Sequence, residues 1–188
     1  MRKILSALIL LTVFTASAFA ASPSELKRMS VFISNFTETG MYDFNIEDLS
    51  DTDLAEFGIW HNYRNNFKTR IKRCPDKNCP YGSLIIDKKF VAESVRKYFD
   101  LDINHRNVDD KRFLHYDGKV YHFEGADGET VYARVYDAER KGGIIIMRGE
   151  TYYPDHEDIE GSPFTAKAKP YKFNGKDTWS IISLKTED

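Results

Sequence analysis

Residues 111–153 read KRFLHYDGKVYHFEGADGETVYARVYDAERKGGIIIMRGETYY, and in them the hydrophobic period of the chain changes to that of β-strands. Apolar and polar residues alternate along most of this stretch, as they do in half-buried strands. Turn dipeptides that favour tight hairpins interrupt the alternation. They are Asp117-Gly118, Asp127-Gly128, Gly142-Gly143 and, further on, Asn174-Gly175. We therefore predict an antiparallel meander sheet of about six strands, at 111–116, 119–125, 129–139, 144–153, 164–173 and 176–184.

Helix start signals precede this stretch. Ser22-Pro23-Ser24-Glu25 has the capping-box pattern with proline at the first helical position, and Ser50 with Asp53 repeats the box. Asp87 is a suitable N-cap for a third helix. About three N-terminal helices packed on a C-terminal antiparallel sheet make an α+β fold. We expect residues 21–188 to form one domain.

The first 20 residues have the pattern of an export signal. Arg2 and Lys3 precede an apolar run, and Ala18-Phe19-Ala20 fits the small-x-small site of a signal peptidase. We predict cleavage after Ala20 and a soluble product that is periplasmic or secreted. No later apolar stretch reaches the roughly 18 residues of a membrane span, so none is expected.

The charge of residues 21–188 argues against one class of partner. They hold 25 basic and 29 acidic residues, without a long block of Lys and Arg. A weakly acidic chain offers no electrostatic surface for phosphate backbones, so we expect no nucleic-acid partner. The partner is then an unknown small molecule or a protein of the cell envelope.

Cys74 and Cys79 are the only cysteines, and four residues separate them in a turn-prone segment. An even number of cysteines in an exported chain predicts a disulfide, which would close a small loop here. His115 and His122 would project from one side of the first hairpin. A metal site there would need His61 to dock above them, and we expect neither a metal nor another cofactor.

The hairpin turns also predict which side chains share a face. Two-residue turns at Asp117-Gly118 and Asp127-Gly128 fix the register of the three strands that they connect. One face of these strands is aliphatic and suits packing against the helices. The other face is aromatic, and we predict it as a contact surface because tyrosine combines a large contact area with a polar tip. Its residues are Tyr121, Tyr132, Arg134 and Tyr136.

No nucleophile elbow, P-loop, HExxH or dinucleotide-binding motif occurs in the sequence. The leading hypothesis is therefore an exported, non-catalytic binding domain. One alternative is a small pocket-type hydrolase or isomerase, with His61 or His122 as general base and Arg134 stabilising negative charge. Another is a structural or inhibitory protein of the cell envelope that acts through the loop around Cys74 and Cys79.

Three segments carry a resemblance that covers most of the mature chain. Residues 31–36 (VFISNF), 57–62 (FGIWHN) and 169–179 (KPYKFNGKDTW) resemble segments of uncharacterised exported bacterial proteins. This resemblance implies an exported domain and assigns no functional residue. The order of helices before strands is similar to that of cystatin-like and nuclear-transport-factor-2-like domains, in which a curved antiparallel sheet wraps around a helix. Such a similarity of architecture does not fix a function.

Overall fold

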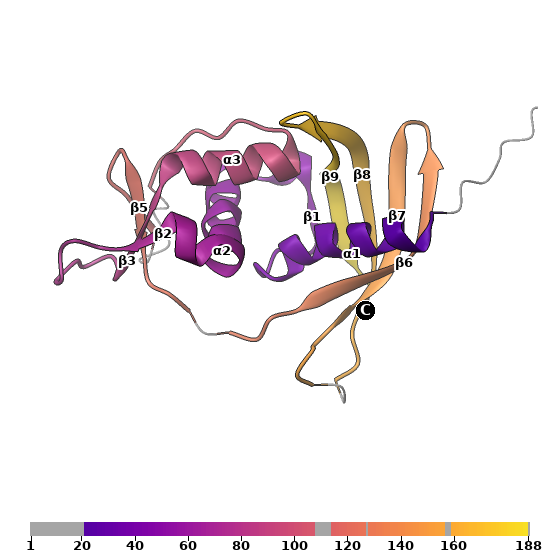
Figure 1. Cartoon of the computed structure of the whole chain (residues 1–188), viewed down its shortest axis with the longest axis horizontal. Helices are drawn as coiled ribbons and strands as arrows, with labels where there is room; N and C mark the ends of the chain where they lie inside the picture. The colour runs from indigo at the N-terminus through magenta and orange to yellow at the C-terminus, as the bar shows by residue number, and fades with distance from the viewer. Residues whose placement is uncertain (1–20, 108–113, 127, 157–158, 188) are drawn as a thin grey trace, which may run out of the picture.

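The computed structural model describes residues 21–107, 114–126, 128–156 and 159–187. The described chain combines three α-helices with two antiparallel sheets, which confirms the predicted α+β class (Figure 1). The predicted leader at 1–20 and Asp127 of a predicted turn lie outside the described residues.

The helices begin at the residues that the sequence marks. They are α1 (Pro23–Thr37), α2 (Asp51–Arg70) and α3 (Lys88–Phe99). The side chains of Ser22, Ser50 and Asp87 each accept a hydrogen bond from a backbone amide of the first turn. Ser50 and Asp53 form the complete, reciprocal capping box. Of the helices that the structure describes, none has both the length and the apolar character needed to cross a membrane.

The larger sheet has five strands in the order β1-β9-β8-β7-β6. Their bounds are β1 (Phe44–Asn45), β6 (Tyr132–Lys141), β7 (Ile144–Tyr152), β8 (Pro163–Phe173) and β9 (Lys176–Thr186). Two of the predicted turns close its hairpins: Gly142-Gly143 joins β6 to β7, and Asn174-Gly175 joins β8 to β9. All four turn residues have positive φ, between 50° and 81°, as a two-residue turn of this hand requires.

Helix α1 covers the outer edge of this sheet. The Oγ atoms of Ser30 and Ser34 accept hydrogen bonds from the β6 amides of Val135 and Ala133, at 2.9 and 3.0 Å. The hydroxyl of Thr37 donates a hydrogen bond to the carbonyl of Val131, the residue before β6, at 2.7 Å. An edge strand with free amides can pair with another chain, so the hydroxyl groups of Ser30 and Ser34 protect the edge by occupying two of its amides.

The smaller sheet has four strands in the order β2-β3-β5-β4. Their bounds are β2 (Ile71–Arg73), β3 (Leu84–Asp87), β4 (Leu114–Tyr116) and β5 (Val120–Phe123). Here the structure differs from a single meander. β5 pairs with β3 and β4, so it does not pair with β6, and the strands expected in one sheet are divided between two.

The β4–β5 turn is displaced by one residue from the predicted position. The Oδ1 atom of Asp117 accepts hydrogen bonds from the amides of Lys119 and Val120, both at 2.9 Å. Asp117 therefore precedes the turn, and Gly118 and Lys119 form its centre. The pairing moves by two residues as a result, and His115 lies directly opposite His122.

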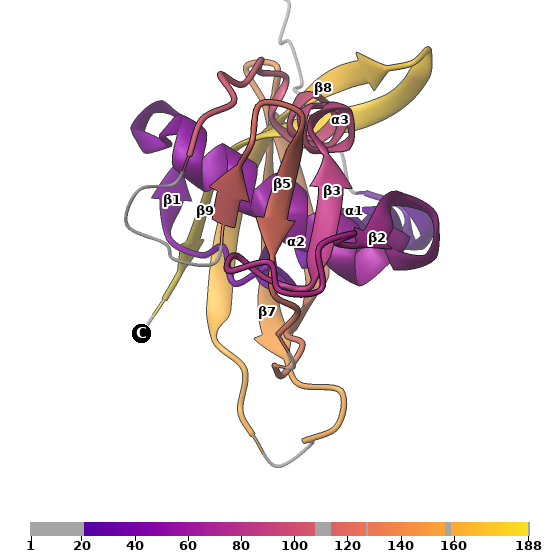
Figure 2. The same ribbon diagram turned by 90° about the vertical axis from the view of Figure 1, so that its left-hand side faces the viewer.

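Helices α2 and α3 lie between the two sheets (Figures 1 and 2). Leu54 and Phe57 of α2 belong to the core shared with the larger sheet, whereas Ala55 and Ile59 belong to the core shared with the smaller one. The helices cross closely at Gly58, where a Cβ atom would lie 2.7 Å from a methyl group of Val91 in α3. The smaller sheet thus lies against α2 and α3, with its other face turned outward.

Candidate metal-binding site

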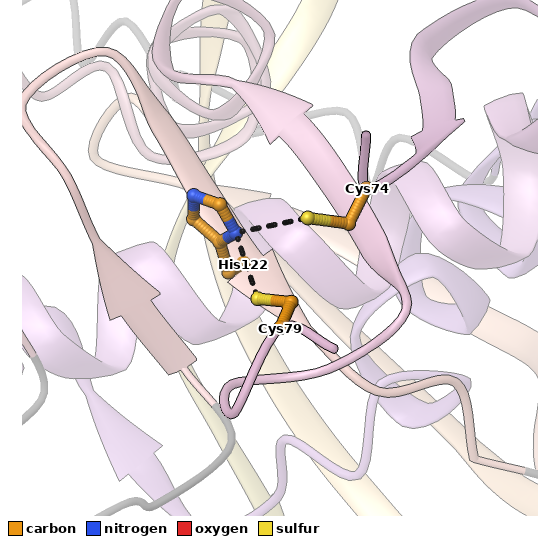
Figure 3. Close-up of side chains that lie close together, drawn as sticks. All are labelled: Cys74, Cys79 and His122. Atoms are coloured by element: carbon orange, nitrogen blue, oxygen red, sulfur yellow. Dashed lines mark hydrogen bonds between the residues drawn. The ribbon is translucent and has the colours of Figure 1, made fainter. Parts of the chain in front are cut away.

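Three side chains with metal-ligating atoms converge on the outer face of the smaller sheet. The Nδ1 atom of His122 lies 3.6 Å from Sγ of Cys74 and 3.4 Å from Sγ of Cys79 (Figure 3). All three atoms lie within 4.8 Å of one another, and the three residues are partly buried. Cys74 follows β2, Cys79 lies in the β2–β3 loop, and His122 belongs to β5.

The predicted disulfide between Cys74 and Cys79 is wrong, because both cysteines are free thiols in the structure. The sulfur atoms point toward the imidazole of His122, as Figure 3 shows. The spacing of the two cysteines predicts a bonded pair, and nothing near them in the sequence indicates a third group between the sulfur atoms.

Backbone contacts hold the loop that carries the cysteines. The amide of Cys74 donates to the carbonyl of Ser83 at 2.8 Å, and Ser83 donates from its amide and hydroxyl to the Glu124 carboxylate, both at 2.8 Å. Gly82 has φ +129°, and a Cβ atom there would lie 2.2 Å from the carbonyl carbon of Phe123. Only glycine fits this backbone approach, which keeps the loop against the end of β5.

Asp117 orients the imidazole of His122 from the other side. Its Oδ2 atom accepts a hydrogen bond from Nε2 of His122 at 3.2 Å. Backbone hydrogen bonds from Val120 and Lys119, together with this contact, lower the pKa of the Asp117 carboxyl to about 2. An ionised carboxylate on Nε2 keeps the proton on that nitrogen and turns the Nδ1 lone pair toward the sulfur atoms. Metal-binding histidines usually donate their second ring N–H to a carboxylate, a backbone carbonyl or a water, and Asp117 is such a partner.

The environment of Cys74 disfavours a free thiolate. Partial desolvation raises the pKa of this thiol, and the neighbouring Cys79 raises it further, whereas a backbone hydrogen bond at Asp76 lowers it. A cation among the sulfur atoms would replace the thiol protons, as metal binding to cysteine requires.

The predicted aromatic surface is only partly assembled. Tyr132, Arg134 and Tyr136 all belong to β6, where Tyr136 is 56% exposed and Arg134 pairs with Glu150 at 3.4 Å. Tyr121 does not join them, which corrects that prediction. It lies in β5, is fully buried beneath the helices, and donates to or accepts from His105 at 3.0 Å. The cause is the pairing of β5 with β3 and β4.

The residues of the predicted catalytic alternative do not meet. His61 is buried in α2, with its ring stacked on Phe57 at 5.6 Å. Burial, together with the charges of Lys97 and Arg70, lowers the pKa of His61 to about 3. His122 belongs to the smaller sheet and Arg134 to the larger one. A general base and an oxyanion-stabilising group must face the same reacting atoms, and this arrangement does not provide that.

In comparisons with known proteins, no family model, curated protein or solved structure matches the chain. The resemblance to exported bacterial proteins stays a prediction.

One signal in the sequence points to the site. His115 and His122 were expected on one side of the hairpin, and the cysteines precede that hairpin by about 40 residues. What the sequence did not reveal is β3, which brings the cysteine loop beside β5.

Proposed function

We propose that this chain is a non-catalytic binding domain whose ligand is a thiophilic metal ion, held by Cys74, Cys79 and His122. The observation that carries the proposal is the convergence of two sulfur atoms on one imidazole nitrogen whose ring is oriented by Asp117. This ligand takes the place of the unknown small molecule expected from the sequence, and the proposal departs from the expectation that no metal is bound.

The distances support a metal site. Bonds of about 2.3 Å to sulfur and about 2.0–2.1 Å to nitrogen at a tetrahedral zinc ion separate the two ligand atoms by about 3.6 Å. The sulfur–nitrogen distances of 3.6 and 3.4 Å are close to this value. A small shift of side chains is therefore enough to bind such an ion.

The hydrogen-bonding capacity of the three groups supports the same conclusion. A neutral imidazole whose Nε2 carries the proton has one lone pair, on Nδ1. Two thiols compete for that lone pair at Cys74 and Cys79. A cation among the three atoms accepts an electron pair from each of them, so it satisfies the whole cluster.

The donor set selects the class of metal. Thiolate and imidazole ligands suit Zn²⁺ and Cu⁺, whereas Ca²⁺ and Mg²⁺ prefer oxygen ligands. From the predicted export signal at 1–20, we propose that this binding takes place in the periplasm or outside the cell. There the bound ion competes with oxidation of the two thiols to a disulfide.

The metal content of the reduced protein tests the proposal. After incubation with Zn²⁺ and removal of free ion, the full chain should retain one zinc per molecule. Cys74→Ser, Cys79→Ser and His122→Gln should each lose it, because each removes one ligand atom. His156→Gln, which changes an exposed histidine paired with Glu129, is the matched control and should retain zinc. Equal zinc content in the ligand variants and the control would refute the proposal.

A further inference from the structure

We infer that His115 is the fourth ligand of the metal site and completes a Cys2His2 set of the zinc class. The inference rests on the proposed metal binding at Cys74, Cys79 and His122. It names the residue that closes the coordination sphere.

The strand register places His115 at the site. His115 of β4 is the direct partner of His122 of β5, so both side chains emerge on the same face of the sheet. Their ring centres are 5.9 Å apart. Two imidazoles on one tetrahedral zinc, each bound at about 2.0–2.1 Å, hold their ring centres about 5 Å apart. In the structure the ring nitrogens of His115 lie outside the group of ligand atoms within 4.8 Å of one another, so its coordination requires a change in its side-chain torsions.

Tyr81 holds the ring of His115 beside the cysteine loop. The two rings are stacked, with centres 3.7 Å apart and planes inclined by 12°. Tyr81 lies two residues after Cys79, so the same loop that supplies a sulfur ligand also contacts His115. Stacking engages the face of the imidazole, whereas metal coordination uses a nitrogen in the ring plane. The ring can therefore bind a metal while it keeps an aromatic neighbour.

A fourth protein ligand changes what the site does. Structural zinc sites have four protein ligands, whereas catalytic zinc sites keep one position for water or substrate. With His115 bound, the ion is closed to substrate. It then joins the cysteine loop to the β4–β5 hairpin, which agrees with a domain that binds metal without catalysis.

Cobalt binding to the full, reduced chain tests the inference, since Co²⁺ replaces Zn²⁺ and absorbs visible light. The wild type should show sulfur-to-cobalt charge transfer and the intense visible bands of four-coordinate cobalt. His115→Ala should keep the charge transfer, because both cysteines remain, but its visible bands should shift and weaken as water enters. Its Zn²⁺ affinity should fall by at least about tenfold, because loss of a hydrogen-bond partner of a metal ligand alone lowers metal affinity by that much. His156→Ala is the control and should match the wild type.

The outcomes separate this inference from the proposed function. An absence of charge transfer in the wild type would refute metal binding by the cysteines. Charge transfer in the wild type with an identical spectrum and affinity in His115→Ala would refute only the role of His115. If that variant does not fold, ¹⁵N spectra of the wild-type imidazoles decide the question. Zn²⁺ should shift a ring nitrogen of His115 as strongly as one of His122, and an unmoved His115 would overturn the inference.

Discussion

Asp117 uses its two carboxylate oxygens for two separate purposes. Oδ1 accepts the backbone amides that shape the β4–β5 turn, and Oδ2 accepts the hydrogen bond from His122. The same residue thus sets the strand register that brings His115 opposite His122 and orients the imidazole toward the cysteines. A substitution that spares the first contact and removes the second can separate the two effects.

Asp117→Asn is such a substitution. Its amide oxygen can still accept the turn amides, while its NH2 group faces Nε2 of His122 and cannot accept the hydrogen bond. We expect Zn²⁺ affinity to fall about 10–100-fold, as for other losses of an outer partner of a metal-binding histidine. Competition with a chromophoric chelator measures this, with exposed Asp155→Asn as the control. Unchanged affinity in Asp117→Asn would mean that the carboxylate does not orient the imidazole.

His61 gives the free energy of unfolding a pH dependence of its own. Its pKa is about 3 in the folded protein because of burial, and about 6.5 in an unfolded chain. The unfolded state therefore binds one more proton between these values, so folding becomes less favourable as the pH falls from 6.5 toward 3. The slope from this group is at most about 1.4 kcal/mol per pH unit.

Urea unfolding of metal-free protein across this pH range measures the effect. His61→Gln should flatten the dependence, since glutamine does not titrate, even if the variant is less stable at neutral pH. The control is His156→Gln, because His156 is exposed and about half of its side chain is open to solvent. A slope in His61→Gln equal to that of the control would contradict the assignment to His61.

At the scale of elements, α1 joins the larger sheet through hydroxyl groups as well as through apolar packing. Ser30 and Ser34 stand one helical turn apart, so both face β6. In that position they accept hydrogen bonds from two alternate β6 amides, which a neighbouring strand would otherwise occupy.

Ser34→Ala tests this edge contact. The substitution leaves the buried amide of Ala133 without its acceptor, and we expect a loss of about 1–3 kcal/mol in the free energy of unfolding. Chemical denaturation measures it. Ser24→Ala, at an exposed position of the same helix, should change stability by about 0.5 kcal/mol or less. A similar small change in both variants would show that the Ser34 hydroxyl is not needed at the edge.

The sequence predicts the elements whose signals are local. Helix caps and the Gly142-Gly143 and Asn174-Gly175 turns depend on residues next to one another, and the structure has them as predicted. β2 and β3 were missed because they have three and four residues, too few to show a period. The partner of β5 was also missed, because it depends on β3, which lies more than 30 residues earlier.

The metal site depends on that missed pairing. The strand pattern predicts that the two histidines share one side of a hairpin, but no local signal connects that hairpin to the cysteines. Strand pairing between distant segments depends on which apolar faces the helices bury. α2 carries apolar residues toward both sheets, and this second apolar face is the sequence feature that allows a second sheet.

At the scale of the whole molecule, the site lies in the smaller sheet, on the far side of α2 and α3 from the larger sheet (Figure 2). A bound ion would connect the β2–β3 loop to β5, and both belong to that sheet. The two sheets share α2 and α3, so a link in one sheet stabilises the folded state of the domain as a whole.

Zinc should therefore raise the thermal midpoint of the reduced protein. A ligand at 100 times its dissociation constant adds about 2.7 kcal/mol to the free energy of unfolding if it binds only the folded state. Calorimetry with and without Zn²⁺ measures the shift. The increase should disappear in Cys79→Ser and persist in His156→Gln. An increase that survives in Cys79→Ser would place the stabilising ion elsewhere.

X-ray absorption at the zinc edge of the loaded, reduced protein tests the central claim most directly, because it reports the atoms bound to the metal. We predict two sulfur atoms at about 2.3 Å and lighter atoms at about 2.0–2.1 Å. A zinc ion surrounded by nitrogen and oxygen alone, or by a single sulfur, would contradict binding by Cys74 and Cys79.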